Sequence, residues 1–213
     1  MHKTMVMLAA AAIAVVSGCS NIERSRNLAN PEVSAKTLAA QVCSNCHGLD
    51  GNSTSPAFPR LAGQQADYIV SQLNNFRDHQ RIDPPGYQYM WGLSRHLSDE
   101  QIAGLAGYYS KQTVHRLPMP PEDAKQWAIG KNIFDKGLPD ENVIACSACH
   151  GPTGQGMAAF PRLANQHADY LLKQLDIFQN TQGRPGTPME TVSHPLTGPD
   201  KAAVAAYLQA FPD

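Results

Sequence analysis

The sequence of 213 residues predicts an all-α chain, organised as two tandem copies of one small helical domain. Three observations predict this. A short motif of two cysteines and a histidine occurs twice, starting at Cys43 and again at Cys146. A longer block that follows the motif is repeated as well, which indicates a duplicated unit. Apolar residues recur at helical spacing in both copies, whereas alternating strand patterns are weak.

Composition supports folded domains. Hydrophobic residues make up 42% of the chain and charged residues 16%, which is typical of a globular protein and not of a disordered one. The length allows one or two domains with modest cores. The formal net charge of −1 gives no reason to expect nucleic acid as a partner.

The first residues predict export from the cytoplasm. A short basic head precedes an apolar stretch, residues 5–16, that is too short to span a bilayer comfortably. Ser17 and Gly18 then precede Cys19, which resembles a bacterial lipoprotein signal. We therefore expect residues 1–18 to be a signal peptide and Cys19 to carry lipid as the only membrane attachment. An ordinary signal peptide followed by an incidental cysteine is the alternative. Residues 19–30 then form a polar tether with a reach of roughly 20 Å.

The two motifs predict covalent haem attachment. Each reads Cys-x-x-Cys-His, as Cys43, Cys46 and His47 and again as Cys146, Cys149 and His150. Two thiols on one helical turn reach the two vinyl groups at one edge of a porphyrin. The histidine that follows then lies beneath the iron as the proximal ligand.

Other readings of the cysteines explain less of the pattern. A thioredoxin-like redox pair needs a surrounding strand–helix unit, which the sequence lacks. A zinc site could use four cysteines, but it accounts for neither histidine. We therefore expect two haem c groups and no cysteine left for a disulfide within either domain.

The repeated block sets the domain boundaries. Residues 58–76 read FPRLAGQQADYIVSQLNNF and residues 160–178 read FPRLANQHADYLLKQLDIF, with twelve of nineteen positions identical. We expect a first domain at residues 31–111 and a second at residues 122–213. Residues 112–121 between them contain several prolines, which predicts a linker without helix.

Each domain is predicted to hold a central and a closing helix. The central helices span residues 65–77 and 166–180, where tyrosine, glutamine and phenylalanine recur at equal spacing. Ser98 and Gln101 form a capping-box pattern at the start of the first closing helix. The second closing helix is expected to start near Thr197.

The sixth iron position is predicted by aligning the closing segments. Met90 and Met189 stand at equal distances before a leucine and a tyrosine, in the loop expected before each closing helix. The matched set is Met90, Leu97 and Tyr108 in the first copy, and Met189, Leu196 and Tyr207 in the second. A methionine at one shared position suggests thioether ligation of both irons, although many methionines only fill cores.

Rival ligands exist, but none has a like partner in the other copy. Met157 follows Cys149 so closely that it is poorly placed to reach the opposite haem face. The rivals are His79, His96, His115 and Met119 in the first half, and Met157, His167 and His194 in the second.

The repeated block also suggests residues around each haem. The carbonyls of Pro59 and Pro161 could accept a hydrogen bond from the proximal histidines, which would fix the rings. Arg60 and Arg162 could pair with haem propionates. Further hydrogen bonds could come from Tyr68, Tyr170, Gln64 and Gln166. The alternative is that this block repeats only because it packs a helix.

With these motifs in place, the chain resembles the dihaem cytochrome c4 family. The resemblance covers nearly everything after residue 31 and implies two class I cytochrome c domains, each wrapped around one covalently bound haem. It also implies electron transfer between a quinol-oxidising complex, such as a quinol–cytochrome c reductase, and a terminal oxidase or other periplasmic reductase. In one departure, the second domain has a long N-terminal helix with Gly130 and Phe134, whereas the first has only a short lead-in at residues 34–42.

These expectations describe an electron carrier and not an enzyme. An iron with two protein ligands has no open position for a small-molecule substrate, and histidine–methionine ligation raises the potential. We expect a periplasmic carrier attached to a membrane through Cys19. The alternatives are an electron-accepting subunit of a membrane-associated dehydrogenase, or a dihaem enzyme of the peroxidase or thiosulfate dehydrogenase type.

Overall fold

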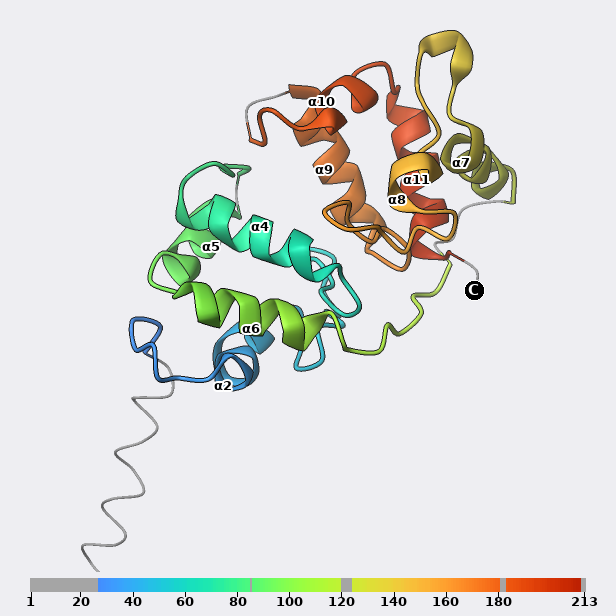
Figure 1. The fold of residues 1–213 in the computed structure, drawn as a ribbon. Helices are drawn as coiled ribbons and strands as arrows, with labels where there is room; N and C mark the ends of the chain where they lie inside the picture. Colours follow the sequence, from blue (N-terminus) through green and yellow to red (C-terminus); the bar gives the residue numbers. More distant parts are fainter. Residues whose placement is uncertain (1–26, 85, 120–123, 181–182, 212–213) are drawn as a thin grey trace, which may run out of the picture.

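The computed structural model describes residues 27–84, 86–119, 124–180 and 183–211. The predicted signal peptide, Cys19 and most of the tether lie outside these residues. Figure 1 shows two helical units joined by one extended segment, as the repeat predicts. In the described part of the chain, β-structure is limited to two isolated bridges, Leu138 to Val143 and Met157 to Phe160. None of the helices described is long and apolar enough to cross a membrane.

The first domain surrounds its haem motif with short helices. Its elements are α2 (Ala35–Leu38), a π-helical turn η1 (Ala39–Cys43), α3 (Ser44–His47), α4 (Ala66–Arg77), α5 (Tyr87–Ser94) and α6 (Asp99–Tyr109). Helix α6 begins with the predicted capping box between Ser98 and Gln101. Its buried face packs on α2 and α4, and the largest buried side chains there are Leu38, Ile102 and Tyr109.

The second domain repeats this order with a longer entry. Its elements are α7 (Ala124–Lys136), a 3₁₀ turn η2 (Pro139–Glu141), α8 (Ser147–His150), α9 (Ala168–Asn180), α10 (Pro188–Ser193) and α11 (Gly198–Gln209). Helix α11 begins next to Thr197, where the sequence predicts its start, and the structure adds a capping box between Thr197 and Asp200. Phe134 and Tyr207 are almost fully buried in the core.

The contact between α7 and α11 depends on Gly130. A methyl group at Gly130 would lie 2.1 Å from the carbonyl oxygen of Ala203, so only glycine allows the two backbones to approach this closely. One turn along α7, the Phe134 ring lies 5.7 Å from the Tyr207 ring. Gly130 and Phe134, the two residues that distinguish this helix in the sequence, therefore both pack α7 on the closing helix.

In the first domain the small residue lies on the other helix. Gly104 of α6 faces Ala35 of α2, and a methyl group at Gly104 would come within 2.6 Å of the Ala35 side chain. The short lead-in helix therefore crosses the closing helix closely without the glycine and phenylalanine pair of α7. Leu28 also packs against this core, so the last residues of the predicted tether are attached to the domain.

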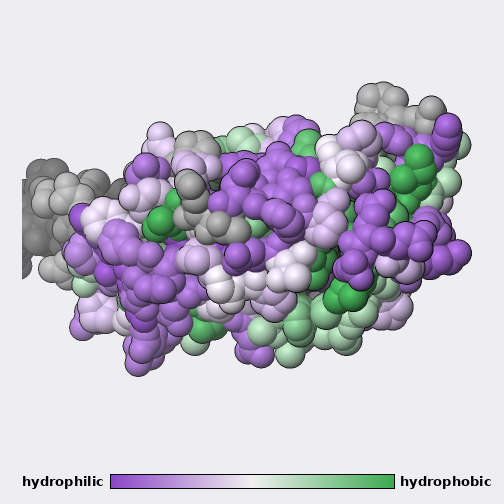
Figure 2. Space-filling model, turned by 90° about the horizontal axis from the view of Figure 1, so that it is seen from above, coloured by the Kyte–Doolittle hydropathy of each residue, from purple (hydrophilic) through white to green (hydrophobic). Residues whose placement is uncertain are grey.

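The linker is extended and is bonded to both domains. Residues 113–119 have no helix. The Asn52 side chain donates to the carbonyl of Thr113 at 2.9 Å, and the Leu117 N–H donates to Asn165 Oδ1 at 3.3 Å. The domains face each other through α4, α9 and the loops before them (Figure 1). In Figure 2 hydrophilic residues cover most of the face seen from above.

Candidate functional site

Each haem motif forms one tight helical turn. Cys43 ends η1, and Cys46 and His47 lie on α3, while Cys146 precedes α8, which holds Cys149 and His150. None of these four cysteines forms a disulfide, and all are half-buried. Burial raises the pKa of the Cys43 and Cys146 thiols to about 11, so both are protonated near neutral pH. Because both cysteines of a motif lie on the same helical turn, they are placed as attachment to one edge of a porphyrin requires.

The histidine of each motif is buried and oriented by a backbone carbonyl. His47 Nδ1 lies 2.8 Å from the Pro59 carbonyl oxygen, and His150 Nδ1 lies 2.9 Å from that of Pro161. Because a carbonyl only accepts, Nδ1 carries the proton and Nε2 keeps its lone pair. Burial lowers the pKa of both histidines, which favours the neutral form that binds metals.

This donor set fits a covalently bound haem. Each motif offers two thiols and a neutral imidazole whose Nε2 is not used by the backbone contact. An aromatic ring lies edge-on beside each imidazole, with Phe58 6.3 Å from His47 and Phe160 6.2 Å from His150. Among the residues described, no group of three histidine, cysteine or acidic side chains is arranged to hold a metal ion.

Met90 and Met189 lie on short helices, not on the loops that the sequence suggested. Met90 is in α5 and Met189 is in α10, and both are half-buried. Pro188 occupies the first turn of α10, a position where proline favours a helix, so the proline-rich sequence there was misread as a loop. In both copies a fully buried serine, Ser94 or Ser193, follows four residues later.

The rival ligands are placed differently. His79 is exposed, has a left-handed backbone with φ of 56°, and packs its ring 5.0 Å from Trp91. His167 is buried, but its Nε2 lies 2.9 Å from the Ser53 carbonyl of the other domain. The remaining rivals are all exposed: His96, His115, Met119, Met157 and His194.

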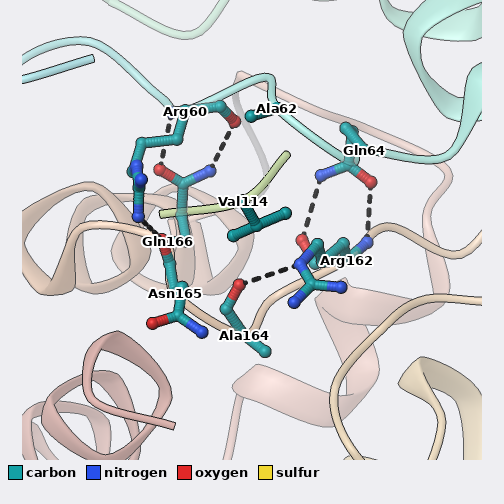
Figure 3. Close-up of a pocket in the computed structure, with 8 residues that line it drawn as sticks. All are labelled: Arg60, Ala62, Gln64, Val114, Arg162, Ala164, Asn165 and Gln166. Atoms are coloured by element: carbon teal, nitrogen blue, oxygen red, sulfur yellow. Dashed lines mark hydrogen bonds between the residues drawn. The ribbon is translucent and has the colours of Figure 1, made fainter. Parts of the chain in front are cut away.

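Arg60 and Arg162 lie at the boundary between the domains. Figure 3 shows them in a small pocket together with Gln64 and Gln166. The Arg60 guanidinium donates to the Asn165 carbonyl at 2.7 Å and to the Asn52 side chain. Arg162 Nε donates to the Ala164 carbonyl at 3.2 Å. These contacts join protein groups, and Arg60 Nε is buried without a protein partner.

A second buried cluster lies between the domains and was not predicted from the sequence. Arg81 donates to Tyr170 at 3.2 Å, and Arg184 donates to Tyr68 at 3.2 Å, so each arginine crosses to the tyrosine of the other domain. Each arginine also stacks on a phenylalanine of its own domain, Arg81 at 4.5 Å from the Phe76 ring and Arg184 at 4.6 Å from the Phe178 ring. The cluster is completed by Gln72, Gln174 and Asp83.

Tyr68 and Tyr170 therefore contact two arginines that do not occupy equivalent positions when the two copies of the repeat are aligned. The spacing from phenylalanine to arginine is five residues in the first copy and six in the second. Asp83 has no counterpart at all. Only the recurrent tyrosine and glutamine on α4 and α9 could have pointed to a shared role.

The family assignment follows from comparison with known proteins. The cytochrome c family model matches this chain twice, over residues 33–112 and 127–211. Cytochrome c-552 of Acidithiobacillus ferridurans is 35% identical over 99% of this chain and 90% of its own length. Cytochrome c4 of Pseudomonas aeruginosa is 36% identical over 84% of this chain and 89% of its own. The chain belongs to the dihaem cytochrome c4 family.

A solved structure agrees with this assignment. The crystal structure of reduced recombinant cytochrome c4 from Pseudomonas stutzeri matches with a TM-score of 0.72 and 33% identity, covering 86% of this chain and 99% of that one. A thiosulfate dehydrogenase electron acceptor from Stutzerimonas stutzeri is 34% identical over 79% of this chain and 78% of its own length. This cytochrome c4 is an electron-transfer protein with two covalently bound haem c groups, one in each domain.

Proposed function

We propose that this cytochrome carries electrons in a periplasmic respiratory chain, from a quinol-oxidising complex or a dehydrogenase to a terminal oxidase or reductase. The observation that carries the proposal is that the two domains place their histidine and their methionine in the same way. His47 and His150 each present a free Nε2 from the same backbone contact. Met90 and Met189 each occupy the same place on the short helix before the closing helix.

In this proposal the two haems have the same ligand set. Cys43, Cys46, Cys146 and Cys149 form the thioether links, His47 and His150 are the proximal ligands, and Met90 and Met189 complete the coordination. A haem held by these residues would supply one-electron transfer without an open position for substrate. The protein's contribution is to hold the ring of each histidine, exclude water and present an apolar rim to partners.

The exposed apolar side chains beside the two haem motifs suit transient docking of redox partners. Leu49 and Phe58 are exposed beside the first motif, and Ile144, Met157 and Phe160 beside the second. Transient redox complexes have small interfaces of this kind. The net charge is −1, cleavage of the signal peptide would remove Lys3, and four ionised propionates would bring the total to about −6. We therefore expect partners with basic docking surfaces and turnover that slows as salt is raised.

A spectroelectrochemical titration of the holo-protein tests the ligand set. Both haems should titrate at positive potential, and the weak methionine-to-ferric charge-transfer band should report methionine on each. In Met90→Ala, half of that band should disappear and one potential should fall, with the mirror result in Met189→Ala. A haem that lacks the band in the unmodified protein would make its iron a candidate catalytic site and would favour the enzyme alternative.

A second role is favoured by one relative. The similarity to a thiosulfate dehydrogenase electron acceptor suggests that this cytochrome could receive electrons directly from a periplasmic dehydrogenase. Such a subunit would copurify with a dehydrogenase from solubilised membranes, whereas a diffusing carrier would be recovered alone.

Export and anchoring complete the proposal. We propose cleavage after residue 18, acylation of Cys19, a tether over residues 19–30, and domains at residues 31–111 and 122–213 joined by residues 112–121. Metabolic labelling with a radioactive fatty acid should mark the protein. In Cys19→Ser the label should be absent and the cytochrome should be released with the periplasmic fraction.

A further inference from the structure

One peptide group connects each proximal histidine to a side chain of the other domain. The Pro59 carbonyl accepts from His47 Nδ1 at 2.8 Å, and the Arg60 N–H donates to Gln166 Oε1 at 2.8 Å. That carbonyl and that N–H belong to the same planar peptide unit. Gln166 is therefore joined to His47 by two hydrogen bonds and one conjugated amide, across the boundary between the domains.

The second haem site has the same connection in the opposite direction. The Pro161 carbonyl accepts from His150 Nδ1 at 2.9 Å, and the Arg162 N–H donates to Gln64 Oε1 at 2.7 Å. Gln64 belongs to the first domain and His150 to the second. The arrangement is therefore reciprocal: each domain supplies the glutamine that contacts the proximal peptide of the other.

Each glutamine is held by a second bond and shielded from water. Gln166 Nε2 donates to the Arg60 carbonyl at 2.9 Å, and Gln64 Nε2 donates to the Arg162 carbonyl at 3.0 Å. Figure 3 shows both paired bonds, one on each side of the pocket. Gln64 and Gln166 are each only 6% exposed. Two bonds to one backbone segment fix the amide orientation, because its oxygen must face the N–H and its nitrogen the carbonyl.

We propose that Gln64 and Gln166 are positioning residues that set the redox potential of the haem in the opposite domain. The inference rests on the proposed function, in which His47 and His150 are the proximal ligands. A glutamine oxygen that accepts from the arginine N–H polarises the peptide unit, and its carbonyl becomes a stronger acceptor for the histidine proton. An imidazole that donates more strongly is a more electron-rich ligand.

The direction of the effect follows from this chain of bonds. A more electron-rich imidazole stabilises ferric over ferrous iron, so each glutamine lowers the potential of the opposite haem. Contact between the domains thereby adjusts both haems at once. If the glutamines served only to hold the domains together, their loss would admit water to the haem surroundings, and water favours the ferric charge. That purely structural role predicts a fall in potential, and the proposed role predicts a rise.

The experiment uses the full holo-protein with Gln166→Leu and Gln64→Leu, which keep most of the side-chain volume and remove both bonds. Potentials are measured by spectroelectrochemical titration, with each haem followed through its own assigned methyl resonances in the proton NMR spectrum. We expect a positive shift for the first haem in Gln166→Leu and for the second haem in Gln64→Leu, with the other haem unchanged in each case. The resonance of the His47 or His150 Nδ1–H should shift only at the affected haem.

Gln65→Leu provides a matched control. Gln65 Nε2 also donates across the boundary at 2.8 Å, but to the Gln155 carbonyl, which accepts no bond from a proximal histidine. Its loss should leave both potentials unchanged. Gln166→Glu is the conservative variant, since it retains an acceptor for the Arg60 N–H. The first haem should then keep its potential or titrate lower, with the His47 Nδ1–H resonance unmoved or shifted toward a stronger hydrogen bond. Simple loss of the contact would instead shift that resonance toward a weaker hydrogen bond, so the comparison still discriminates if the leucine variant does not fold.

Several results would overturn the proposal. These are a shift of the haem in the variant's own domain, equal shifts of both haems, a fall in potential in the leucine variants, or the same shift in Gln65→Leu. Failure of the proposed function has a separate signature. In that case the unmodified protein would lack a six-coordinate low-spin spectrum or the Nδ1–H resonance, before any glutamine is changed.

Discussion

Arg184 of the second domain donates a hydrogen bond from Nη2 to the Tyr68 hydroxyl of the first domain at 3.2 Å. Arg81 makes the mirror contact to Tyr170 at the same distance. The symmetry ends at Asp83, which pairs with Arg81 at 2.5 Å, because no equivalent carboxylate pairs with Arg184 among the residues that the structure describes. Two buried guanidinium groups therefore share one protein carboxylate at the centre of the interface.

Replacing Asp83 with asparagine should weaken the interface. The side chain is 5% exposed, and removing one partner of a buried ion pair costs roughly 3 kcal/mol or more. We expect Asp83→Asn to lower the free energy of unfolding of the holo-protein by about that amount, measured by urea denaturation. Asp78→Asn is the control, because the exposed Asp78 and Arg77 pair should contribute less than about 1 kcal/mol. Equal effects of the two changes would show that Asp83 does not support the interface.

The Asp83 carboxylate should also determine how the free energy of unfolding falls in acid. Burial alone would raise the pKa of Asp83, but the hydrogen bond and charge of Arg81 outweigh it and hold this pKa below its ordinary value. The stabilisation is therefore present above the unfolded pKa of about 3.9 and is lost as pH falls through the folded pKa. Asp83→Asn should flatten the stability profile below about pH 4. An unchanged profile would contradict the assignment.

His167 should make the interface sensitive to milder acid. Burial lowers the pKa of His167, its bond to the Ser53 carbonyl opposes this, and Arg60 lowers the pKa further while Asp169 raises it. Below about pH 6.5 the unfolded chain takes up this proton first. The free energy of unfolding should then fall with decreasing pH, by at most about 1.4 kcal/mol per pH unit, until the folded pKa is reached.

His167→Gln tests this prediction, because glutamine is the residue found at the equivalent position of the first domain. The aligned position of the first copy is Gln65, whose amide donates to a backbone carbonyl of the other domain. A glutamine at position 167 should keep the bond to Ser53 and remove the loss of stability between pH 6.5 and the folded pKa. The slope is measured by urea denaturation at a series of pH values, and an equal slope in His167→Gln would count against the mechanism.

The sequence predicted what depends on local chemistry. The haem motifs, the duplicated central helices, the cap at Ser98 and the start of the last helix near Thr197 were readable because each depends on residues a few positions apart. The Arg81 and Arg184 cluster was not readable, because the loops that supply the arginines differ in length between the copies. Arg60 was recognised for its charge, yet its backbone N–H and carbonyl are what Gln166 binds. Pairing across two domains cannot be inferred from the spacing within one.

The close approach of α7 and α11 should require glycine at position 130. Alanine there would place its methyl group 2.1 Å from a backbone oxygen of α11, which cannot move aside as a flexible side chain could. We expect Gly130→Ala to destabilise the second domain by about 3 kcal/mol or more. Gly198→Ala in α11 has nothing within 4 Å of the added methyl and should be neutral or slightly stabilising. Thermal unfolding of the two holo-proteins compares them, and similar midpoints would refute the close crossing.

In the first domain, a pair of compensating substitutions can test the close approach of α2 and α6. Gly104→Ala should destabilise it through contact with the Ala35 methyl group, which lies 2.6 Å from the added atom. In the double variant Gly104→Ala with Ala35→Gly the methyl group has only moved to the other helix. The double variant should therefore recover most of the lost stability, because the two helices still hold one glycine and one alanine between them. Additive losses would mean that the two positions do not meet.

Haem attachment should decide whether each domain folds. Each core is built from only a few large buried side chains, such as Leu38, Ile102 and Tyr109 in the first domain, and domains of this size bury too little surface to be stable alone. We expect the chain without either haem to have little helix by circular dichroism. The sharper test is Cys43→Ala with Cys46→Ala, which leaves the second haem in place. Helix content should fall by about the share that α2 to α6 contribute, because the intact second domain supplies interface contacts but no replacement core. Native helix content in this variant would show that docking on the second domain alone can fold the first.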